Sequence, residues 1–340
     1  MSERAPDDRG VVAARPERGG GAATPSFRLP PDAPAGMPGA PAPLRVGPAT
    51  LAWGTRTYVM GILNVTPDSF SGDGLLAGRA DGRAAVGDGA PAVAAAVALA
   101  RQMTDEGADV LDIGGESTRP GHDLVDDGAE IERVVPVIRA IRAALPAMAL
   151  SVDTTKVAVA AAALDAGADL VNDVRGVDAG DDLLGLVAER GVPIILMHQR
   201  AEARYTNLMA EILADLQRAI ERALRAGIGW DSIVVDPGFG FGKTPAHNLV
   251  LLRELEALRV LGRPIVLGTS RKSTLGKVLD LPAGERLEAT LATTALGIAA
   301  GVDMVRVHDV RPNVRVARMT DAIVRIDAPD PLAPTEGDFP

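Results

Sequence analysis

The stretch YVMGILNVTPDSFSGDG, residues 58–74, changes character at Asn64. The residues before Asn64 are apolar, as in a strand that is covered on both faces. The residues after it are polar and rich in Gly, Ser and Asp, as in a loop. A buried strand that ends on an amide and passes into a polar loop is typical of a strand whose carboxyl end faces a binding site.

The same succession of an apolar strand and a helix repeats along the chain. Seven further strands are predicted in DVLDIGG (109–115), MALSVDT (148–154), DLVNDV (169–174), PIILMH (193–198), SIVVDPG (232–238), PIVLGTS (264–270) and DMVRVHDV (303–310). Helices are predicted over Ala92–Glu106, Ala129–Leu145, Lys156–Ala166, Asp181–Arg190, Leu208–Ala226, His247–Val260, Lys272–Leu279, Gly284–Ala299 and Pro312–Val324. Eight strands in alternation with helices predict an α/β fold, the (β/α)8 TIM barrel. A doubly wound open sheet is the alternative, but no G-x-G-x-x-G motif opens a helix after the first strand.

The segments outside this alternation complete the predicted organisation of the chain. LRVGPATLAWGTRTYVM, residues 44–60, predicts a β-hairpin that turns at Gly54-Thr55 and closes the bottom of the barrel. Residues 1–43 are rich in Pro, Gly and Ala without a period, which predicts a disordered tail. The barrel domain is expected over residues 44–326, followed by a flexible C-terminal tail over residues 327–340.

Composition excludes several classes of function. The net charge of -10 over 340 residues argues against nucleic acid or an anionic membrane surface as the main partner. No apolar run approaches the roughly 20 residues that span a bilayer. There is no cysteine, and therefore neither a disulfide nor a thiolate metal site. A cytoplasmic location fits these features.

Every predicted strand ends in a side chain that can form hydrogen bonds or ionise. In chain order these residues are Asn64, Asp112, Asp153, Asn172, His198, Asp236, Ser270 and Arg306. Each has an ordinary explanation when taken alone, such as a helix N-cap for Asp153 or a turn residue for Asp236. In a barrel all eight meet on one face, which is where such folds carry their chemistry. That coincidence favours an active site.

These residues divide into two chemical groups. Asp153, Asn172 and Asp236 are acceptors that suit a flat heterocycle rich in N–H donors, such as an aminopyrimidine. Carboxylates can also bind a metal, but no His cluster accompanies them and Asn is a poor main ligand. No Ser-His-Asp or Cys-His arrangement for covalent catalysis stands out.

The second group is cationic and suits an anionic leaving group such as phosphate or pyrophosphate. It comprises Arg119, Lys272, Arg306 and His308. Asn64 lies beside the eighth strand in a closed barrel, where it can share the anion or its Mg²⁺.

Eight stretches in order resemble the bacterial dihydropteroate synthase family. They are MGILNVTPDSFS, DIGGESTRPG, SVDTTK, VNDVRG, LMH, DPGFGFGK, GTSRKS and RVHDV, and the resemblance covers roughly residues 44–325. It implies a transferase of folate biosynthesis. Such an enzyme joins 6-hydroxymethyl-7,8-dihydropterin pyrophosphate to p-aminobenzoate, giving 7,8-dihydropteroate and pyrophosphate. It also implies Mg²⁺ as cofactor, small-molecule substrates as partners, a homodimer and a cytoplasmic location.

The resemblance also implies a role for each matching residue. The pterin site would be Asp153, Asn172, Asp236, Lys272, Met197 and Phe241. The pyrophosphate site would be Asn64, Thr118, Arg306 and His308, with Asn64 also a ligand of the metal. The p-aminobenzoate pocket and its lid would be Asp68, Phe70, Asp73, Thr118, Arg119, Pro120 and Ser273. The catalytic residues would be Lys272, Arg306, His308 and Asp153, acting in a dissociative reaction in which pyrophosphate departs first.

Two other functions are compatible with the same barrel. A pterin-dependent methyltransferase would share the Asp153, Asn172 and Asp236 set but not the SRK and RVHDV stretches. A non-catalytic pterin-binding paralogue would keep the pterin pocket without turnover. The feature that favours the paralogue is the lid, which reads SFSGDG where the family usually reads SFSDGG.

Overall fold

The computed structural model describes residues 41–65, 89–116, 125–178 and 180–325, and the strands among them form a barrel. The barrel strands are β3 (Tyr58–Asn64), β4 (Val110–Gly114), β5 (Ala149–Asp153), β6 (Leu170–Asp173), β7 (Ile194–Met197), β8 (Ile233–Asp236), β9 (Val266–Leu267) and β10 (Met304–Val307). All pair in parallel, in the order β8-β7-β6-β5-β4-β3-β10-β9. A parallel bridge between Val235 and Ile265 joins the two edge strands. The predicted TIM-barrel fold is confirmed.

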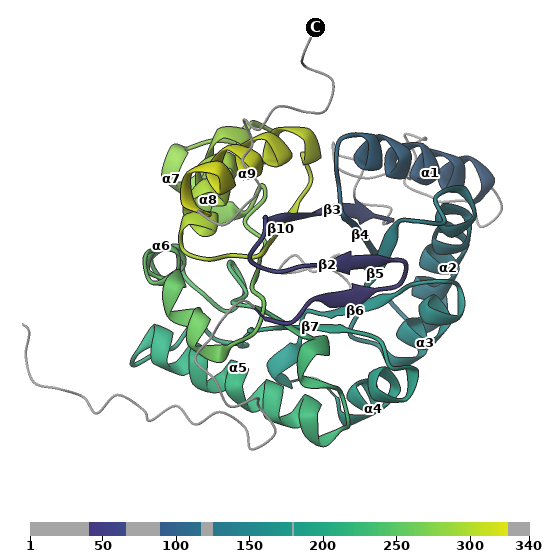
Figure 1. Cartoon of the computed structure of the whole chain (residues 1–340), viewed down its shortest axis with the longest axis horizontal. Helices are drawn as coiled ribbons and strands as arrows, with labels where there is room; N and C mark the ends of the chain where they lie inside the picture. The colour runs from purple at the N-terminus through teal and green to yellow at the C-terminus, as the bar shows by residue number, and fades with distance from the viewer. Residues whose placement is uncertain (1–40, 66–88, 117–124, 179, 326–340) are drawn as a thin grey trace, which may run out of the picture.

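Helices form a ring outside the strands (Figure 1). They are α1 (Gly89–Asp105), α2 (Asp127–Ala144), α3 (Val157–Asp165), α4 (Asp181–Arg190), α5 (Leu208–Arg225), α6 (Pro245–Arg253), α7 (Ser273–Leu279), α8 (Leu287–Ala299) and α9 (Val310–Val324). Their apolar faces and the strands share one core, in which Leu111, Leu150 and Ile138 are fully buried. None of the helices in the described ranges is long and apolar enough to cross a bilayer.

The hairpin before the barrel is present, but its predicted turn is wrong. Strands β1 (Leu44–Val46) and β2 (Ala49–Leu51) pair antiparallel and turn at Gly47-Pro48, with Gly47 at a φ of 55°. A two-residue hairpin loop needs positive φ at its first central residue, which glycine supplies. The turn at Gly54-Thr55 leads from β2 into β3 instead.

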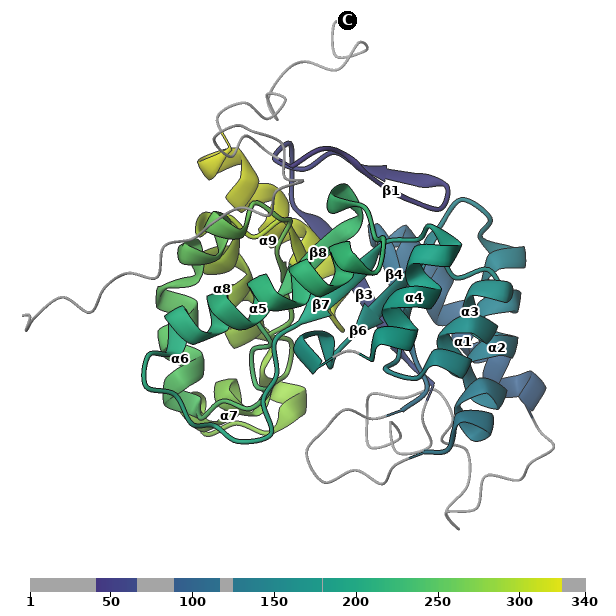
Figure 2. The ribbon, with the colours of Figure 1, turned by 90° about the horizontal axis from the view of Figure 1, so that it is seen from below.

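The hairpin covers the bottom of the barrel, as predicted. Figure 2 shows it lying across one end of the molecule. Leu51 and Trp53 pack there against residues near the starts of the barrel strands, which include Met60, Val110, Ala149, Leu170, Ile195, Val234, Val266 and Met304. The apolar lower end leaves the opposite end of the barrel for the polar residues.

The long helix predicted over His247–Val260 is shorter in the structure. Helix α6 ends at Arg253, and Leu255–Leu261 forms 3₁₀ turns. Leu255, Leu258 and Leu261 are spaced three apart and all buried. A 3₁₀ helix places such residues on one face because it has three residues per turn. Burial of the leucines therefore overrides the α-helical propensity of this segment.

Candidate active site

Strand pairing places the predicted site residues in one row. Asn64 is opposite Gly114, Gly114 is opposite Asp153, and Asp153 is opposite Asn172. A Cβ atom on Gly114 would lie 3.7 Å from Asn64 Oδ1 and 3.8 Å from Asp153 Oδ2. The glycine therefore lets these two polar side chains lie close together at the carboxyl end of the barrel. Further round, Asp236 is opposite the buried Met197.

The centre of the site is a buried cluster around Arg306. Its Nε donates to Asp112 Oδ2 at 2.6 Å, and its Nη2 donates to Asp153 Oδ2 at 2.6 Å. Asn172 Nδ2 donates to the same oxygen of Asp112 at 3.0 Å. The other carboxylate oxygen of each aspartate is buried and has no hydrogen-bond partner within the described part of the chain. Buried polar atoms are normally satisfied, so these two oxygens are available to donors of a ligand.

Burial changes the protonation of this cluster. It raises the pKa of Asp153 to about 7, although the Arg306 cation opposes the shift and Asp112 adds to it. Burial likewise raises the pKa of Asp236, against the influence of Lys272. A carboxyl group with a pKa near 7 can accept or donate a hydrogen bond at neutral pH.

Lys272 and Asp236 lie on the other side of the site. Asp236 Oδ1 accepts a hydrogen bond from Gly238 N at 2.7 Å. The Lys272 ammonium donates to the carbonyl of Phe239, and its Nζ lies 4.3 Å from the centroid of the Phe241 ring. Burial lowers the pKa of Lys272 to about 8, while Asp236 opposes the shift. The aromatic ring, the cation and the carboxylate together form a surface suited to a flat, polar ring.

His308 and Ser270 lie beside Arg306 at the ends of neighbouring strands. Ser270 Oγ is 3.0 Å from His308 Nδ1 and accepts from the backbone N–H of His308 at 3.2 Å. Arg271, the next residue, forms a bidentate ion pair with Asp309 at 2.7 and 3.1 Å. The hydroxyl therefore orients the imidazole, and the Arg271 guanidinium is held by Asp309.

The described residues contain no group of three or more His, Asp or Glu side chains arranged to hold a metal ion. Asn64 is half-buried and ends β3 beside Asp153. Mg²⁺ commonly takes only one or two protein ligands and completes its coordination with substrate phosphates and water. A single amide oxygen at this position fits that mode of binding.

Several predicted site residues cannot be placed. Asp68, Phe70, Asp73, Thr118, Arg119 and Pro120 lie outside the described residues, so their roles stay predictions. Ser273 is the first residue of α7, directly after Lys272. Phe241 is half-buried in the loop after β8.

The sequence predicts no specific role for Asp112, although it belongs to the eight strand-end residues, and none for Lys243. Asp112 sits inside an apolar strand, and a charged residue in such a run is seldom fully buried without a partner. Lys243 is the last residue of the stretch DPGFGFGK. Its position at the end of a glycine-rich loop is the sequence feature that could have indicated a role near the site. The structure adds that Arg306 contacts both Asp112 and Asp153, which its predicted pyrophosphate role does not include.

Comparisons with known proteins place this site in a wider context. The family described as pterin binding enzyme matches residues 60–308. A dihydropteroate synthase of Clostridium beijerinckii is 47% identical over 273 residues, covering 80% of this chain and 96% of its own. One of Bacillus subtilis is 46% identical over 269 residues, covering 79% of this chain and 89% of its own.

Solved structures agree with the sequence relatives. A dihydropteroate synthase of Clostridium difficile, solved in the presence of pteroic acid, has a TM-score of 0.74 and 46% identity, covering 80% of this chain and 98% of that one. One of Xanthomonas albilineans, in complex with 7,8-dihydropteroate, has a TM-score of 0.72 and 37% identity, covering 83% of this chain and 98% of that one.

Proposed function

We propose that this chain, which belongs to the pterin binding enzyme family and within it to the dihydropteroate synthases, joins a dihydropterin pyrophosphate to p-aminobenzoate. The products are 7,8-dihydropteroate and pyrophosphate. The observation that carries the proposal is the juxtaposition of buried acceptors with the Arg306 and Lys272 cations on one face of the barrel.

The acceptors suit the pyrimidine edge of the pterin. Asp153, Asn172 and Asp236 offer carboxylate and amide oxygens to the ring and amino N–H groups. Asp153 Oδ1, which has no hydrogen-bond partner among the described residues, is one acceptor that can serve the ligand. Lys272 and the Phe241 ring would contact the pterin from the other side, where stacking and cation–π interactions favour a flat ring.

The cations suit the leaving pyrophosphate. Arg306 lies in β10, His308 follows directly after the end of β10, and Asn64 ends β3, the strand that pairs with β10. Arg306 Nε and Nη2 each donate one hydrogen bond to an aspartate, and the remaining N–H groups of the guanidinium suit phosphate oxygens. Mg²⁺, held by Asn64 and the substrate, would neutralise part of the negative charge on the departing group.

We infer a dissociative order of bond changes, as the family resemblance implies. Arg306 and His308 stabilise the charge that develops on the pyrophosphate as its bond to the pterin methylene breaks. The acceptors hold the pterin in place while the methylene is electron-deficient. The amine of p-aminobenzoate then attacks the methylene and releases a proton.

A coupled assay of pyrophosphate release tests this proposal. With both substrates and Mg²⁺, we expect sustained release of pyrophosphate. Omitting either the pterin pyrophosphate or p-aminobenzoate should stop it. Mass spectrometry of the same mixture should detect 7,8-dihydropteroate. Binding of the pterin substrate without any release would instead identify a non-catalytic paralogue, and methyl transfer from a methylated folate would identify a methyltransferase.

We also propose a homodimer in the cytoplasm, as the family resemblance implies. Leu296 on α8, with Met319 and Ile323 on α9, expose 63%, 64% and 67% of their surface. Large exposed apolar side chains on adjacent helices are typical of a protein interface. In sedimentation velocity we expect a species of twice 35.1 kDa, which Leu296→Glu converts to monomer. Val260→Glu, which changes an exposed valine elsewhere, should leave the dimer intact, and a monomeric wild type would contradict the proposal.

A further inference from the structure

A buried lysine lies at the end of the loop that follows β8, at the same end of the barrel as the site. Lys243 Nζ donates to His198 Nδ1 at 2.8 Å, to the Gly238 carbonyl at 3.0 Å and to the Phe241 carbonyl at 3.1 Å. These three acceptors match the three N–H donors of an ammonium group. Burial lowers the pKa of Lys243 to about 7. An apolar side chain would avoid this desolvation, so the lysine calls for an explanation beyond filling space.

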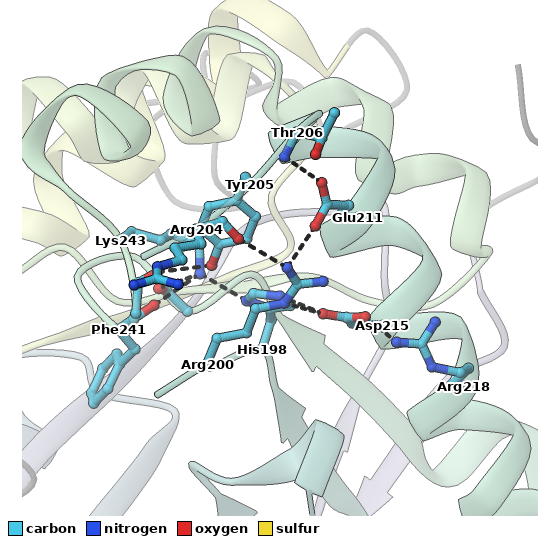
Figure 3. Close-up of polar contacts among 12 residues, drawn as sticks. His198, Arg200, Arg204, Tyr205, Thr206, Glu211, Asp215, Arg218, Phe241 and Lys243 are labelled. Atoms are coloured by element: carbon cyan, nitrogen blue, oxygen red, sulfur yellow. Dashed lines mark hydrogen bonds and ion pairs between the residues drawn. The ribbon is translucent and has the colours of Figure 1, made fainter. Parts of the chain in front are cut away.

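The acceptor of Lys243 is itself held by charged residues (Figure 3). His198 is fully buried, and burial together with the Lys243 charge lowers its pKa to about 3, so the imidazole is neutral. Since its Nδ1 accepts from Lys243, its Nε2 carries the proton and donates to Asp215 Oδ2 at 3.1 Å. Arg200 Nε donates to the same oxygen at 2.8 Å. The lysine is thus anchored to α5 through two ordered side chains.

The loop that Lys243 fastens carries the contacts of two pterin residues. Gly238 N donates to Asp236, and the Phe239 carbonyl accepts from Lys272. A Cβ atom on Gly240 would lie 3.1 Å from Lys272 Cδ, so the lysine stem runs against the loop backbone. A shift of this loop would therefore move Asp236, Lys272 and the Phe241 ring together.

We propose that Lys243 is a positioning residue for the pterin site, which holds the loop over residues 237–243 in the conformation that orients Asp236 and Lys272. The inference rests on the proposed function, because it assumes that those two residues bind the pterin. Lys243 acts through the loop carbonyls and has no role as a ligand of the substrate itself. Its removal should weaken binding of the pterin much more than binding of p-aminobenzoate.

The test is Lys243→Met, with 6-hydroxymethylpterin as the probe in calorimetry at a temperature where circular dichroism shows the variant folded. We expect a dissociation constant at least about tenfold higher than in the wild type. In the steady state, KM for the pterin pyrophosphate should rise while KM for p-aminobenzoate changes less than about twofold. Lys243→Gln, which can still donate to two carbonyls, serves if the methionine variant does not fold, and it should lose less affinity.

The matched control is Arg263→Met. Arg263 is a buried cation that donates to the carbonyls of Gly262 and Trp230 and stacks on the Trp230 ring at 3.9 Å, at the opposite end of the barrel. It should lower the melting temperature without changing the affinity for the pterin. Equal affinity in Lys243→Met and wild type would overturn the inference and leave Lys243 a purely structural residue. A wild type that binds no pterin would instead contradict the proposed function.

Discussion

Replacing Arg306 by alanine is expected to reduce turnover by roughly a hundred- to a thousandfold, the usual loss when one stabilising donor is removed from a reacting charge. The variant should also bind 6-hydroxymethylpterin more weakly. This second effect follows because Arg306 pairs with both Asp112 and Asp153, and its removal leaves two buried carboxylates close together. Breaking a buried ion pair on one side costs about 3–5 kcal/mol. Without the cation, the pKa of Asp153 should rise further above its ordinary value.

Comparison of two ligands separates the roles of Arg306. The pterin alcohol lacks the phosphate oxygens, so its loss of affinity reports the contacts with Asp112 and Asp153. The pyrophosphate ester should lose roughly ten- to a hundredfold more, because a charge-assisted contact disappears as well. A loss limited to the ester would mean that the aspartates need no cation for pterin binding. Equal losses of affinity for the two ligands would mean that Arg306 does not bind the pyrophosphate.

Two further variants control for folding in this experiment. Arg306→Lys keeps a cation but loses the planar guanidinium. Compared with Arg306→Ala, it should bind the pterin more tightly but turn over only slightly faster. Arg142→Ala removes a comparable arginine that pairs with Asp169 and donates to the Met148 carbonyl at 2.7 Å, at the opposite end of β5. It should lower the melting temperature while both ligands bind as in the wild type.

The barrel could be predicted because its elements carry their own signals. The strands are short apolar runs, and five of the helices are followed by a glycine in the left-handed region: Gly107, Gly167, Gly191, Gly227 and Gly301. Such glycines end helices without steric cost. Where the signal depends on tertiary packing, the prediction fails. The 3₁₀ turns over Leu255–Leu261 are fixed by the burial of their leucines. The predicted hairpin turn is wrong for a local reason, because Gly47 and Gly54 both have positive φ and both lie in turns.

The candidate site could be predicted only in part, for a similar reason. Residues at strand ends share one face of any barrel, so Asp153, Asn172 and Arg306 could be grouped from their positions alone. The contact of Arg306 with Asp112 in β4 could not be predicted in this way. It joins residues that are 194 positions apart in the sequence. The anchor of Lys243 on His198 likewise joins two loops that are distant in the sequence. Sequence position shows that such residues are near the site but not what they contact.

Replacing Asp236 by asparagine is expected to weaken binding of 6-hydroxymethylpterin by on the order of a hundredfold, with a similar or larger loss of kcat/KM. The substitution keeps the size of the side chain but replaces a carboxylate oxygen with an NH₂ donor. That donor would face the N–H groups of the pterin edge. Losing the hydrogen bond to that oxygen and burying two donors that face each other, each effect worth about 1.5 kcal/mol or more, gives this magnitude. Because Oδ1 accepts from Gly238 N, the amide oxygen is expected to take that position and leave the NH₂ toward the ligand.

Asp303→Asn provides the matched control for this prediction, because Asp303 is a buried aspartate that also accepts from a backbone N–H. Its Oδ2 accepts from Ile265 N at 3.0 Å, at the amino end of the barrel strands, and burial raises its pKa to about 6. The control should change the melting temperature but not the dissociation constant of the pterin. If both variants bind the pterin as the wild type does, Asp236 is a loop-bracing residue that orients Gly238, and the ring lies elsewhere in the barrel mouth. If only Asp236→Asn loses affinity, the difference isolates the contact with the ring, since both variants remove a buried carboxylate of the same size.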